Sequence, residues 1–243
     1  MKRTLTALAG LALAACCGSD AMAFRGGPPA GFSGSNGDGG LSCILCHGLN
    51  KGAGSVEILG VPDSYEANEI YDLTVRIADP AQAAGGFEIT VEDSEGTKVG
   101  TLMLVDPTLT QFAEGLTEWV SHTEAGVNNA ANDWISLGSA AEYQVRWQAP
   151  AMDLGPITFY AAGNAVNNDM FSTGDNIYLT TVTANTFGSG CAADLDGDGQ
   201  VNSADLALML GSWGGGPGAA DLDDSGDVGS SDLALLLGAW GPC

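Results

Sequence analysis

The sequence is poor in basic residues and in histidine. Lysine and arginine number 7 in 243 residues, against 30 acidic residues, which gives a formal net charge of −23. This acidic surplus argues against nucleic acid and anionic membranes as partners. With only His47 and His122, no Gly-x-Ser-x-Gly and no metalloprotease helix, no nucleophile and base can be nominated. We leave enzymatic activity open and lean towards a protein that is not an enzyme.

Long apolar runs are absent after the N-terminus, so no transmembrane helix is expected there. The N-terminus has a basic start, an apolar run over Leu5–Ala15 and Ala-Met-Ala at residues 21–23, which is the order of a secretory signal. We therefore predict a signal peptide over residues 1–23 and a secreted, extracellular or cell-surface protein. Leu13–Cys16 also resembles a bacterial lipoprotein signal, with the lipid on that cysteine, and this second interpretation stays open.

A twelve-residue pattern typical of calcium loops occurs twice near the C-terminus, starting at Asp194 and again 27 residues later at Asp221. Such loops present oxygen ligands at alternate positions, with glycine at the sharp turn and a backbone carbonyl at position 7. The second loop has Gly229 at position 9, so we expect its calcium affinity to be weaker. The predicted ligands are Asp194, Asp196, Asp198, Gln200, Asn202 and Asp205 in the first loop, and Asp221, Asp223, Ser225, Asp227 and Asp232 in the second.

Each loop runs into a short apolar helix. Leucine, methionine and tryptophan recur at i, i+3, i+4 and i+7, which predicts one apolar face for each helix. We expect the two faces to bury each other. The residues concerned are Leu206, Met209, Leu210 and Trp213, and then Leu233, Leu236, Leu237 and Trp240.

This pair of loops and helices resembles the type I dockerin domain, and Gly190-Cys191 and Pro242-Cys243 resemble the bracketed variant that serves as a C-terminal anchor. The resemblance covers residues 191–243. It implies a small α-helical module folded by calcium and bound to a cohesin-like partner; a calcium-stabilised cap without a partner is the alternative. The residues that would face the partner are Ser203, Ala204, Ser230 and Ser231.

Signal cleavage would leave four cysteines in an oxidising compartment. Cys191 and Cys243 bracket the calcium repeats and are expected to form a disulfide. The chain-entropy model assigns a bridge of this loop length a stabilisation of about 4 kcal/mol.

The other cysteines belong to Cys43-Ile-Leu-Cys46-His47, within a Gly/Pro-rich segment that we place at residues 24–55. This spacing is what covalent c-type haem attachment requires. Two alternatives stay open, a disulfide between the two cysteines and a zinc site completed by His122. If haem is attached, the second axial ligand would be His122 or a methionine among Met103, Met152 and Met170; His122 is otherwise a strand or loop residue bonded to its neighbours.

From Val56 onward the apolar residues recur with period two, as in Tyr71–Ile77, Phe87–Val91 and Tyr143–Trp147. These stretches predict half-buried strands. Further strand candidates are Val99–Asp106, Pro156–Ala161 and Ile177–Ala184. Seven to nine short strands with no helical period predict a mainly β, immunoglobulin-like antiparallel sandwich over residues 56–187.

This part of the chain resembles the bacterial relatives of the Reeler domain, which are secreted modules with interchangeable C-terminal anchors. The resemblance spans about residues 25–185 and lies in Gly26–Gly31, Cys43–Gly48, Gly86–Ile89, His122-Thr123, Trp147–Pro150, Phe159–Asn167 and Gly174–Tyr178.

Three functions follow from these patterns. The first is a non-catalytic surface protein, a Reeler-like sandwich anchored or assembled through the dockerin-like module. The second is a single-haem electron carrier that uses Cys43, Cys46 and His47. The third is an accessory component of extracellular polysaccharide degradation, since dockerins often accompany carbohydrate-active enzymes.

Overall fold

The computed structural model describes residues 24–48, 52–186 and 191–242. The predicted signal peptide, with the lipoprotein cysteine Cys16, and the predicted disulfide partner Cys243 lie outside these residues. Contacts divide the chain into two compact units. One is formed by residues up to 61 with 70–148 and 158–182, and the other by residues 62–69, 149–157 and 183–243. Among the described residues, no helix combines the length and apolarity needed to cross a membrane.

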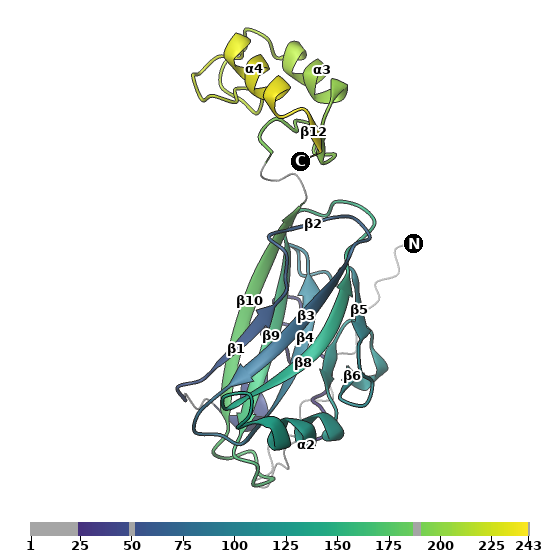
Figure 1. Ribbon diagram of the computed structural model, residues 1–243, viewed down its shortest axis with the longest axis vertical. Helices are drawn as coiled ribbons and strands as arrows, with labels where there is room; N and C mark the ends of the chain where they lie inside the picture. Colours follow the sequence, from purple (N-terminus) through teal and green to yellow (C-terminus); the bar gives the residue numbers. More distant parts are fainter. Residues whose placement is uncertain (1–23, 49–51, 187–190, 243) are drawn as a thin grey trace, which may run out of the picture. The chain divides into compact units, whose positions relative to one another are not determined.

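Two β-sheets make up the larger part of the molecule (Figure 1). The registers described are antiparallel, except that β2 and β10 run parallel over two residues. The four-stranded sheet has the order β1 (Ser55–Leu59), β3 (Ile70–Ala78), β8 (Ala140–Gln148) and β5 (Thr101–Leu104). The six-stranded sheet has the order β2 (Ser64–Tyr65), β10 (Asn176–Thr186), β9 (Ile157–Val166), β4 (Ala84–Glu92), β7 (Val120–His122) and β6 (Thr110–Phe112).

The core lies between the two sheets and follows the predicted alternation. Phe87 of β4 packs against Tyr143 of β8, with ring centroids 4.7 Å apart, and Trp147 of β8 meets Phe159 of β9 edge-on at 4.9 Å. Fully burying one large apolar side chain stabilises a fold by about 1.5–3 kcal/mol. The mainly β, sandwich-like prediction is therefore confirmed for this part of the chain. The inward-facing aliphatic residues include Leu73, Val75, Ile77, Ile89, Val91 and Val145.

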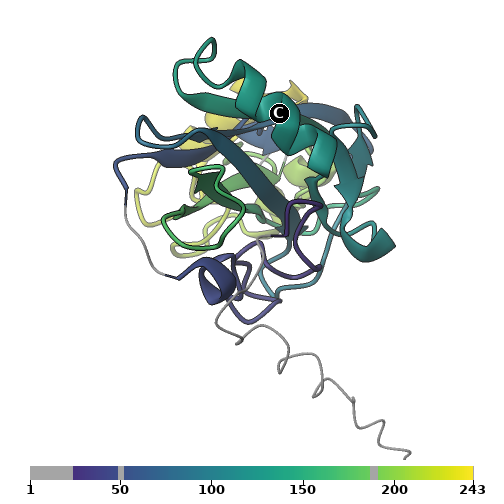
Figure 2. The same cartoon turned by 90° about the horizontal axis from the view of Figure 1, so that it is seen from below.

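Strand β4 is buried on both faces, although its alternation predicted one solvent-facing side. Its outward residues Glu88, Thr90 and Glu92 are fully buried because residues 24–42, which we call the covering segment, pass over them. The backbone N–H of Phe32 donates to Glu88 and that of Gly37 to Glu92. Figure 2 shows this segment in purple, beside the short helix α1 (Ile44–His47) that follows it.

Helix α2 (Glu124–Asp133) was not predicted, and the expectation of no helix within the sandwich region was wrong. The Thr123 side chain caps the helix by accepting from the Gly126 N–H at 3.0 Å. Its buried face holds only Gly126, Val127 and Ala130, so small residues replace the large apolar ones that make a helical period visible. A short 3₁₀ turn, η1 (Ala113–Gly115), precedes β7.

The C-terminal repeats form helices α3 (Ser203–Gly211) and α4 (Ser230–Gly238), with a small pairing of β11 (Gln200–Val201) and β12 (Gly241–Pro242). Met209 and Leu236 are fully buried, as predicted. The prediction that the whole apolar face of each helix is buried was wrong for four residues. Each of these is about half exposed: Leu210, Trp213, Leu237 and Trp240. The core is therefore small, consisting of Ala193, Val201, Met209, Ala220, Val228 and Leu236.

Candidate functional site

A pocket of about 740 Å³ lies in the first unit, beside the covering segment, and its lining is mostly apolar. It brings together all four residues predicted as haem candidates. Ligand-binding pockets usually measure about 300–1,000 Å³. The lining includes Phe24, Arg25, Pro28, Pro29, Phe32, Cys43, Cys46, His47, Gly86, Phe87, His122, Val127, Asn164, Val166, Met170, Phe171 and Asp175.

Helix α1 presents the two cysteines and the adjacent histidine on one turn. The Cys43 carbonyl accepts from the backbone N–H groups of Cys46 and His47, and the turn ends at Gly48, which has a positive φ of 74°. Cys43 is buried against Ala162, while Cys46 is half-buried. Both cysteines are thiols and not the two halves of a disulfide.

Burial raises the pKa of the Cys43 thiol to about 12, and the nearby Glu88 carboxyl acts in the same direction. The thiolate is the reactive form of cysteine. Cys43 is therefore a poor nucleophile once the fold is complete.

The His47 ring contacts two side chains of the pocket. Its Nδ1 lies 2.8 Å from a carboxylate oxygen of Asp175, a fully buried residue just before β10. The Asn164 amide nitrogen on β9 lies close to both ring nitrogens, 3.2 Å from His47 Nδ1 and 3.1 Å from Nε2. The Asn164 amide oxygen is buried without a hydrogen-bond partner. The His47 ring is thus oriented by the β9–β10 part of the sheet.

His122 comes from β7, far from α1 in sequence. Its Nδ1 bonds with the backbone of Phe87, whose N–H lies 2.9 Å away. The ring also lies against Gly86, where an added Cβ would stand only 2.5 Å from the His122 Cε1 atom. Burial lowers the pKa of His122 to about 4, although bonds with the Phe87 and Phe24 backbone oppose this, and His47 lowers it further. His122 is therefore neutral near pH 7, which is the form that binds metals.

Other predicted ligands are not equally placed. Met170 lines the pocket, whereas Met103 and Met152 are not among its lining residues. In the described part of the chain, the groups of three or more His, Cys, Asp or Glu side chains able to hold one metal ion consist of aspartates alone. The zinc alternative for Cys43, Cys46 and the two histidines therefore lacks a converging ligand set.

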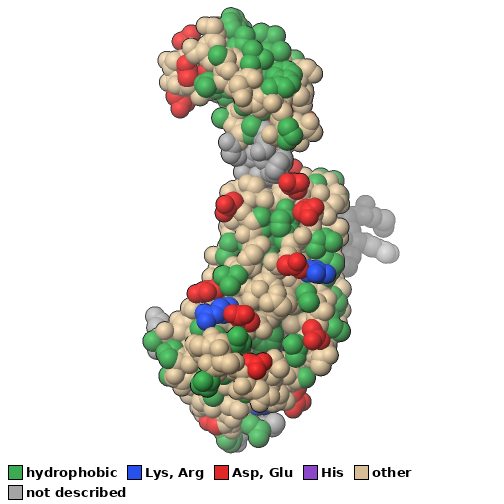
Figure 3. Space-filling view, in the orientation of Figure 1, with side chains coloured by type: hydrophobic (Ala, Val, Ile, Leu, Met, Phe, Trp, Pro, Cys, Tyr) green, Lys and Arg blue, Asp and Glu red, His purple; other side chains and the backbone are tan. Residues whose placement is uncertain are grey.

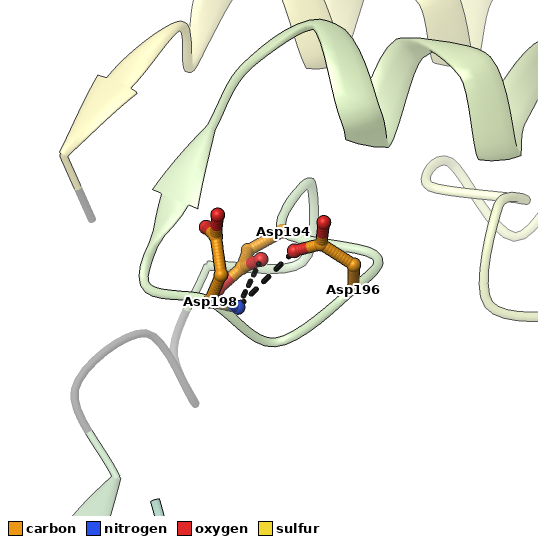
Figure 4. A group of neighbouring side chains, drawn as sticks. All are labelled: Asp194, Asp196 and Asp198. Carbon is orange, nitrogen blue, oxygen red and sulfur yellow. Dashed lines mark hydrogen bonds between the residues drawn. The ribbon is translucent and has the colours of Figure 1, made fainter. Parts of the chain in front are cut away.

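The first of the two C-terminal repeats brings three of its predicted calcium ligands together. Carboxylate oxygens of Asp194, Asp196 and Asp198 lie within 4.8 Å of one another. Figure 4 shows the Asp198 N–H pointing at oxygens of both other aspartates, at 3.2 Å and 3.1 Å. Desolvation, together with the charges of Asp198, Asp205 and Asp194, raises the pKa of Asp196 against one backbone hydrogen bond. A divalent cation would relieve this crowding of negative charge.

Asp205 and Asp232 close the two loops from the first turns of α3 and α4. Asp205 is fully buried and accepts from the N–H groups of Leu195, Asp196 and Asn202 at 2.8–3.2 Å. Burial works against the charge of Asp205, but these bonds still hold its pKa below the usual value. Asp232 accepts in the same way from Leu222, Asp223 and Gly229. The two repeats therefore form the same set of three backbone hydrogen bonds to the last aspartate of the loop.

The second repeat groups Asp232 with Asp221 and Asp223 within 4.8 Å. Among the acidic residues predicted as ligands, Asp227 is not part of that group, and Asp205 is not part of the group in the first repeat. Ser225 and Gln200 are exposed. Asn202 caps α3, because its side chain accepts from the Ala204 N–H at 2.8 Å. The matching position in the second repeat is Gly229, which has no side chain to do so.

The predicted partner residues Ser203, Ala204, Ser230 and Ser231 are all exposed. Apolar side chains also gather on this module, as the green surface at the top of Figure 3 shows. Cys191 is disulfide-bonded, while its predicted partner Cys243 is outside the described residues. The exposed apolar residues of the two helices are Leu208, Leu210, Trp213, Leu235, Leu237 and Trp240.

Sequence reasoning missed Asp175 and Asn164 as site residues. Both fall in stretches that carry the Reeler-like resemblance, but neither has a recognisable spacing to Cys43-x-x-Cys46-His47. Their role depends on a fold that brings residues more than 100 positions apart onto one imidazole.

No protein-family model matches the chain, and comparison with curated proteins finds no match. Among solved structures, the chain is similar to the Reelin-N domain of F-spondin, at 20% identity over 57% of this chain and 88% of that one, with a TM-score of 0.39. The human F-spondin reeler domain matches at 21% identity over 57% and 91%, also with a TM-score of 0.39. A type II cohesin domain from the cellulosome of Acetivibrio cellulolyticus matches at 12% identity over 54% and 95%, with a TM-score of 0.31.

Proposed function

We propose that this chain is an exported electron carrier with one covalently attached haem, held outside the cell by a calcium-dependent C-terminal module. The observation that carries the proposal is the pocket that brings Cys43, Cys46 and His47 together with His122. Haem needs shelter as well as attachment, and an apolar pocket beside the attachment motif supplies it. The Reeler-like sandwich is then the scaffold of the pocket.

The residues of the pocket fit haem in several respects. Cys43 and Cys46 are not joined to each other in a disulfide, and their spacing is the one that two thioether bonds to a single haem require. The imidazoles of His47 and His122 supply nitrogen ligands from two different elements. Arg25, which lines the pocket, is suited to the carboxylate groups of the cofactor. When bound, haem supplies a one-electron redox couple; the protein orients the ligands and excludes water.

The test is the spectrum of the purified, exported full-length protein from a host with cytochrome maturation. We expect a Soret band that survives acid-acetone extraction, and its loss from the Cys43→Ser/Cys46→Ser double variant. A His122→Ala variant should keep the covalent haem but change the spectrum of the iron. A colourless wild-type protein would contradict the haem proposal and leave the first function, a binding or adhesion module with a structural cysteine motif.

We further propose that the C-terminal repeats fold around two calcium ions, the second bound more weakly. The two aspartate groups and the buried carboxylates Asp205 and Asp232 support this. Calcium titration of the full chain, followed by tryptophan fluorescence and calorimetry, should show two binding events, and Asp205→Asn should abolish the tighter one. Asp224→Asn is the matched control, because it removes a charge from a repeat without removing a predicted ligand. Absence of any response to calcium would refute the proposal.

The partner of this module is proposed to be a cohesin-like domain that contacts Ser203, Ala204, Ser230 and Ser231. Their exposure supports this assignment. Immobilised cohesin domains should retain the chain in calcium and release it in chelator. Retention on insoluble glycans instead would favour the third function, an accessory role in polysaccharide degradation.

A further inference from the structure

The His47 imidazole contacts two side chains of the six-stranded sheet and its edge. Asp175 Oδ2 lies 2.8 Å from Nδ1, and the Asn164 amide nitrogen lies 3.2 Å from Nδ1 and 3.1 Å from Nε2. Asp175 is fully buried and Asn164 is 8% exposed. The partners are therefore part of the packed structure of the sheet and not chance surface contacts.

The Asp175 contact favours one tautomer of His47. A carboxylate accepts hydrogen bonds, so the ring proton of a neutral His47 belongs on Nδ1, where it is donated to Asp175. Nε2 then carries the lone pair that a metal ligand requires.

Asp175 is itself held in place. Its other carboxylate oxygen, Oδ1, accepts from the backbone N–H of Asn167 at 3.2 Å, just past the end of β9. Asp175 comes directly before β10, the neighbour of β9 in the six-stranded sheet. Because both of its oxygens are engaged, the Asp175 carboxylate cannot turn away from His47 without breaking the hydrogen bond that the Asn167 N–H donates to it.

We propose that Asp175 is a positioning residue that sets the reduction potential of the site by holding and polarising His47. A carboxylate on the far nitrogen of a ligating histidine raises the basicity of the ligating nitrogen. A more basic ligand stabilises the oxidised iron more than the reduced iron, so Asp175 lowers the reduction potential. This inference rests on the proposed haem function and adds the residue that tunes it.

The test is redox titration of the haem-loaded full chain and its Asp175→Asn variant. Asparagine keeps the shape and an acceptor oxygen but loses the charge. We expect the equilibrium between the oxidised and reduced forms to shift at least tenfold towards the reduced form, which is about 59 mV for a one-electron couple. If Asp175 has only a structural role, the Asp175→Asn variant should have a lower melting temperature and an unchanged reduction potential.

Asp79→Asn is the matched control. Asp79 is also fully buried, but its partners are Tyr178 and Asn176 and not a histidine. This variant should keep the wild-type potential. A potential that moves equally in both variants, or in neither, would overturn the inference.

Failure of this inference and failure of the proposed function can be told apart. A wild-type protein without covalent haem refutes the proposed function, and the inference falls with it. A red wild-type protein whose Asp175→Asn variant keeps haem and potential refutes the inference alone. If the variant does not fold, ¹⁵N NMR of the reduced wild-type protein decides: a slowly exchanging proton on His47 Nδ1 supports the inference, and a freely exchanging one overturns it.

Discussion

Two buried residues, His122 and Glu88, have pKa values that are shifted in opposite directions. Burial lowers the pKa of His122 to about 4 and raises that of Glu88 to about 8. For Glu88, hydrogen bonds from Phe32 and Gly31 and the charge of Lys98 oppose the rise, while Asp38 adds to it. One Glu88 oxygen has no hydrogen-bond partner. Near pH 7 both side chains are therefore neutral, as a water-poor region beneath the covering segment requires.

Replacing Glu88 by glutamine should remove a pH dependence of stability. The pKa of Glu88 in the folded chain lies above its ordinary value of 4.5. The contribution of protonated Glu88 to the free energy of unfolding is therefore complete below pH 4.5 and is lost as the pH rises through about 8. The loss is on the order of 5 kcal/mol across this window. Denaturant unfolding at pH 5 and pH 9 should show a smaller difference for Glu88→Gln than for wild type, whereas the exposed control Glu57→Gln should behave as wild type. An unchanged pH slope in Glu88→Gln would show that another group is responsible.

At the scale of elements, Lys98 fastens the covering segment to the sheet. Its ammonium group pairs with Glu92 on β4 and lies 3.0 Å from Asp38 and 3.1 Å from Ser35 of the segment. It also lies 4.9 Å from the ring centroid of Trp119. Glu92 is fully buried, and its carboxylate contacts Lys98 and the Gly37 N–H.

Lys98→Met should therefore strip a buried carboxylate of its partner. Breaking a buried ion pair from one side costs roughly 3–5 kcal/mol, and the covering segment should open more often. The free energy of unfolding and the alkylation rate of Cys43 in haem-free protein, followed by mass spectrometry, measure both effects. Arg146→Met is the control, because Arg146 and Asp72 form an exposed pair at 2.6 Å that is worth roughly 0–1 kcal/mol. Equal effects of the two substitutions would exclude a fastening role for Lys98.

The two C-terminal repeats, which are predicted to bind calcium, differ at one informative position. Asn202 caps α3 with its side chain, whereas Gly229 occupies the same place before α4. A Cβ at Gly229 would meet nothing closer than 3.8 Å, so asparagine fits there without strain. If the repeats bind calcium as proposed, Gly229→Asn should tighten binding to the second repeat, and Asn202→Gly should weaken binding to the first. Calorimetric titration of the full chain measures both, and unchanged affinities would show that position 9 does not control the asymmetry.

The sequence predicted the strands of the sandwich well because their alternation follows directly from burial on one face. It failed where burial has another origin. The outward residues of β4 are covered by a Gly- and Pro-rich segment that has no periodicity of its own, and α2 is built from small residues. Half of the apolar stripe on α3 and α4 is exposed, since helical spacing shows which residues share a face but not what covers that face. The Cys43-x-x-Cys46-His47 motif was visible in sequence, whereas the presence of His122 in the same pocket and the contact of Asp175 with His47 depend on strand pairing.

At the scale of the whole molecule, the C-terminal module has a small hydrophobic core. Six small or medium side chains form its buried cluster, and domains of this size usually need a disulfide or a metal. Scanning calorimetry of the full chain should therefore show two transitions, of which chelator lowers only the one that belongs to the repeats. If chelator leaves the temperatures of both transitions unchanged, the disulfide at Cys191 is enough to keep the C-terminal module folded without calcium.

The burial of Cys43 has a consequence for how the protein must be made. If its thiol is to receive a cofactor, that reaction has to finish while the chain outside α1 is still open, since folding turns the sulfur inward and suppresses its ionisation. Maturation and folding then compete in time after export. Molecules that close first would remain colourless permanently, so the fraction of red protein in a preparation would record how often the attachment machinery arrives before the fold.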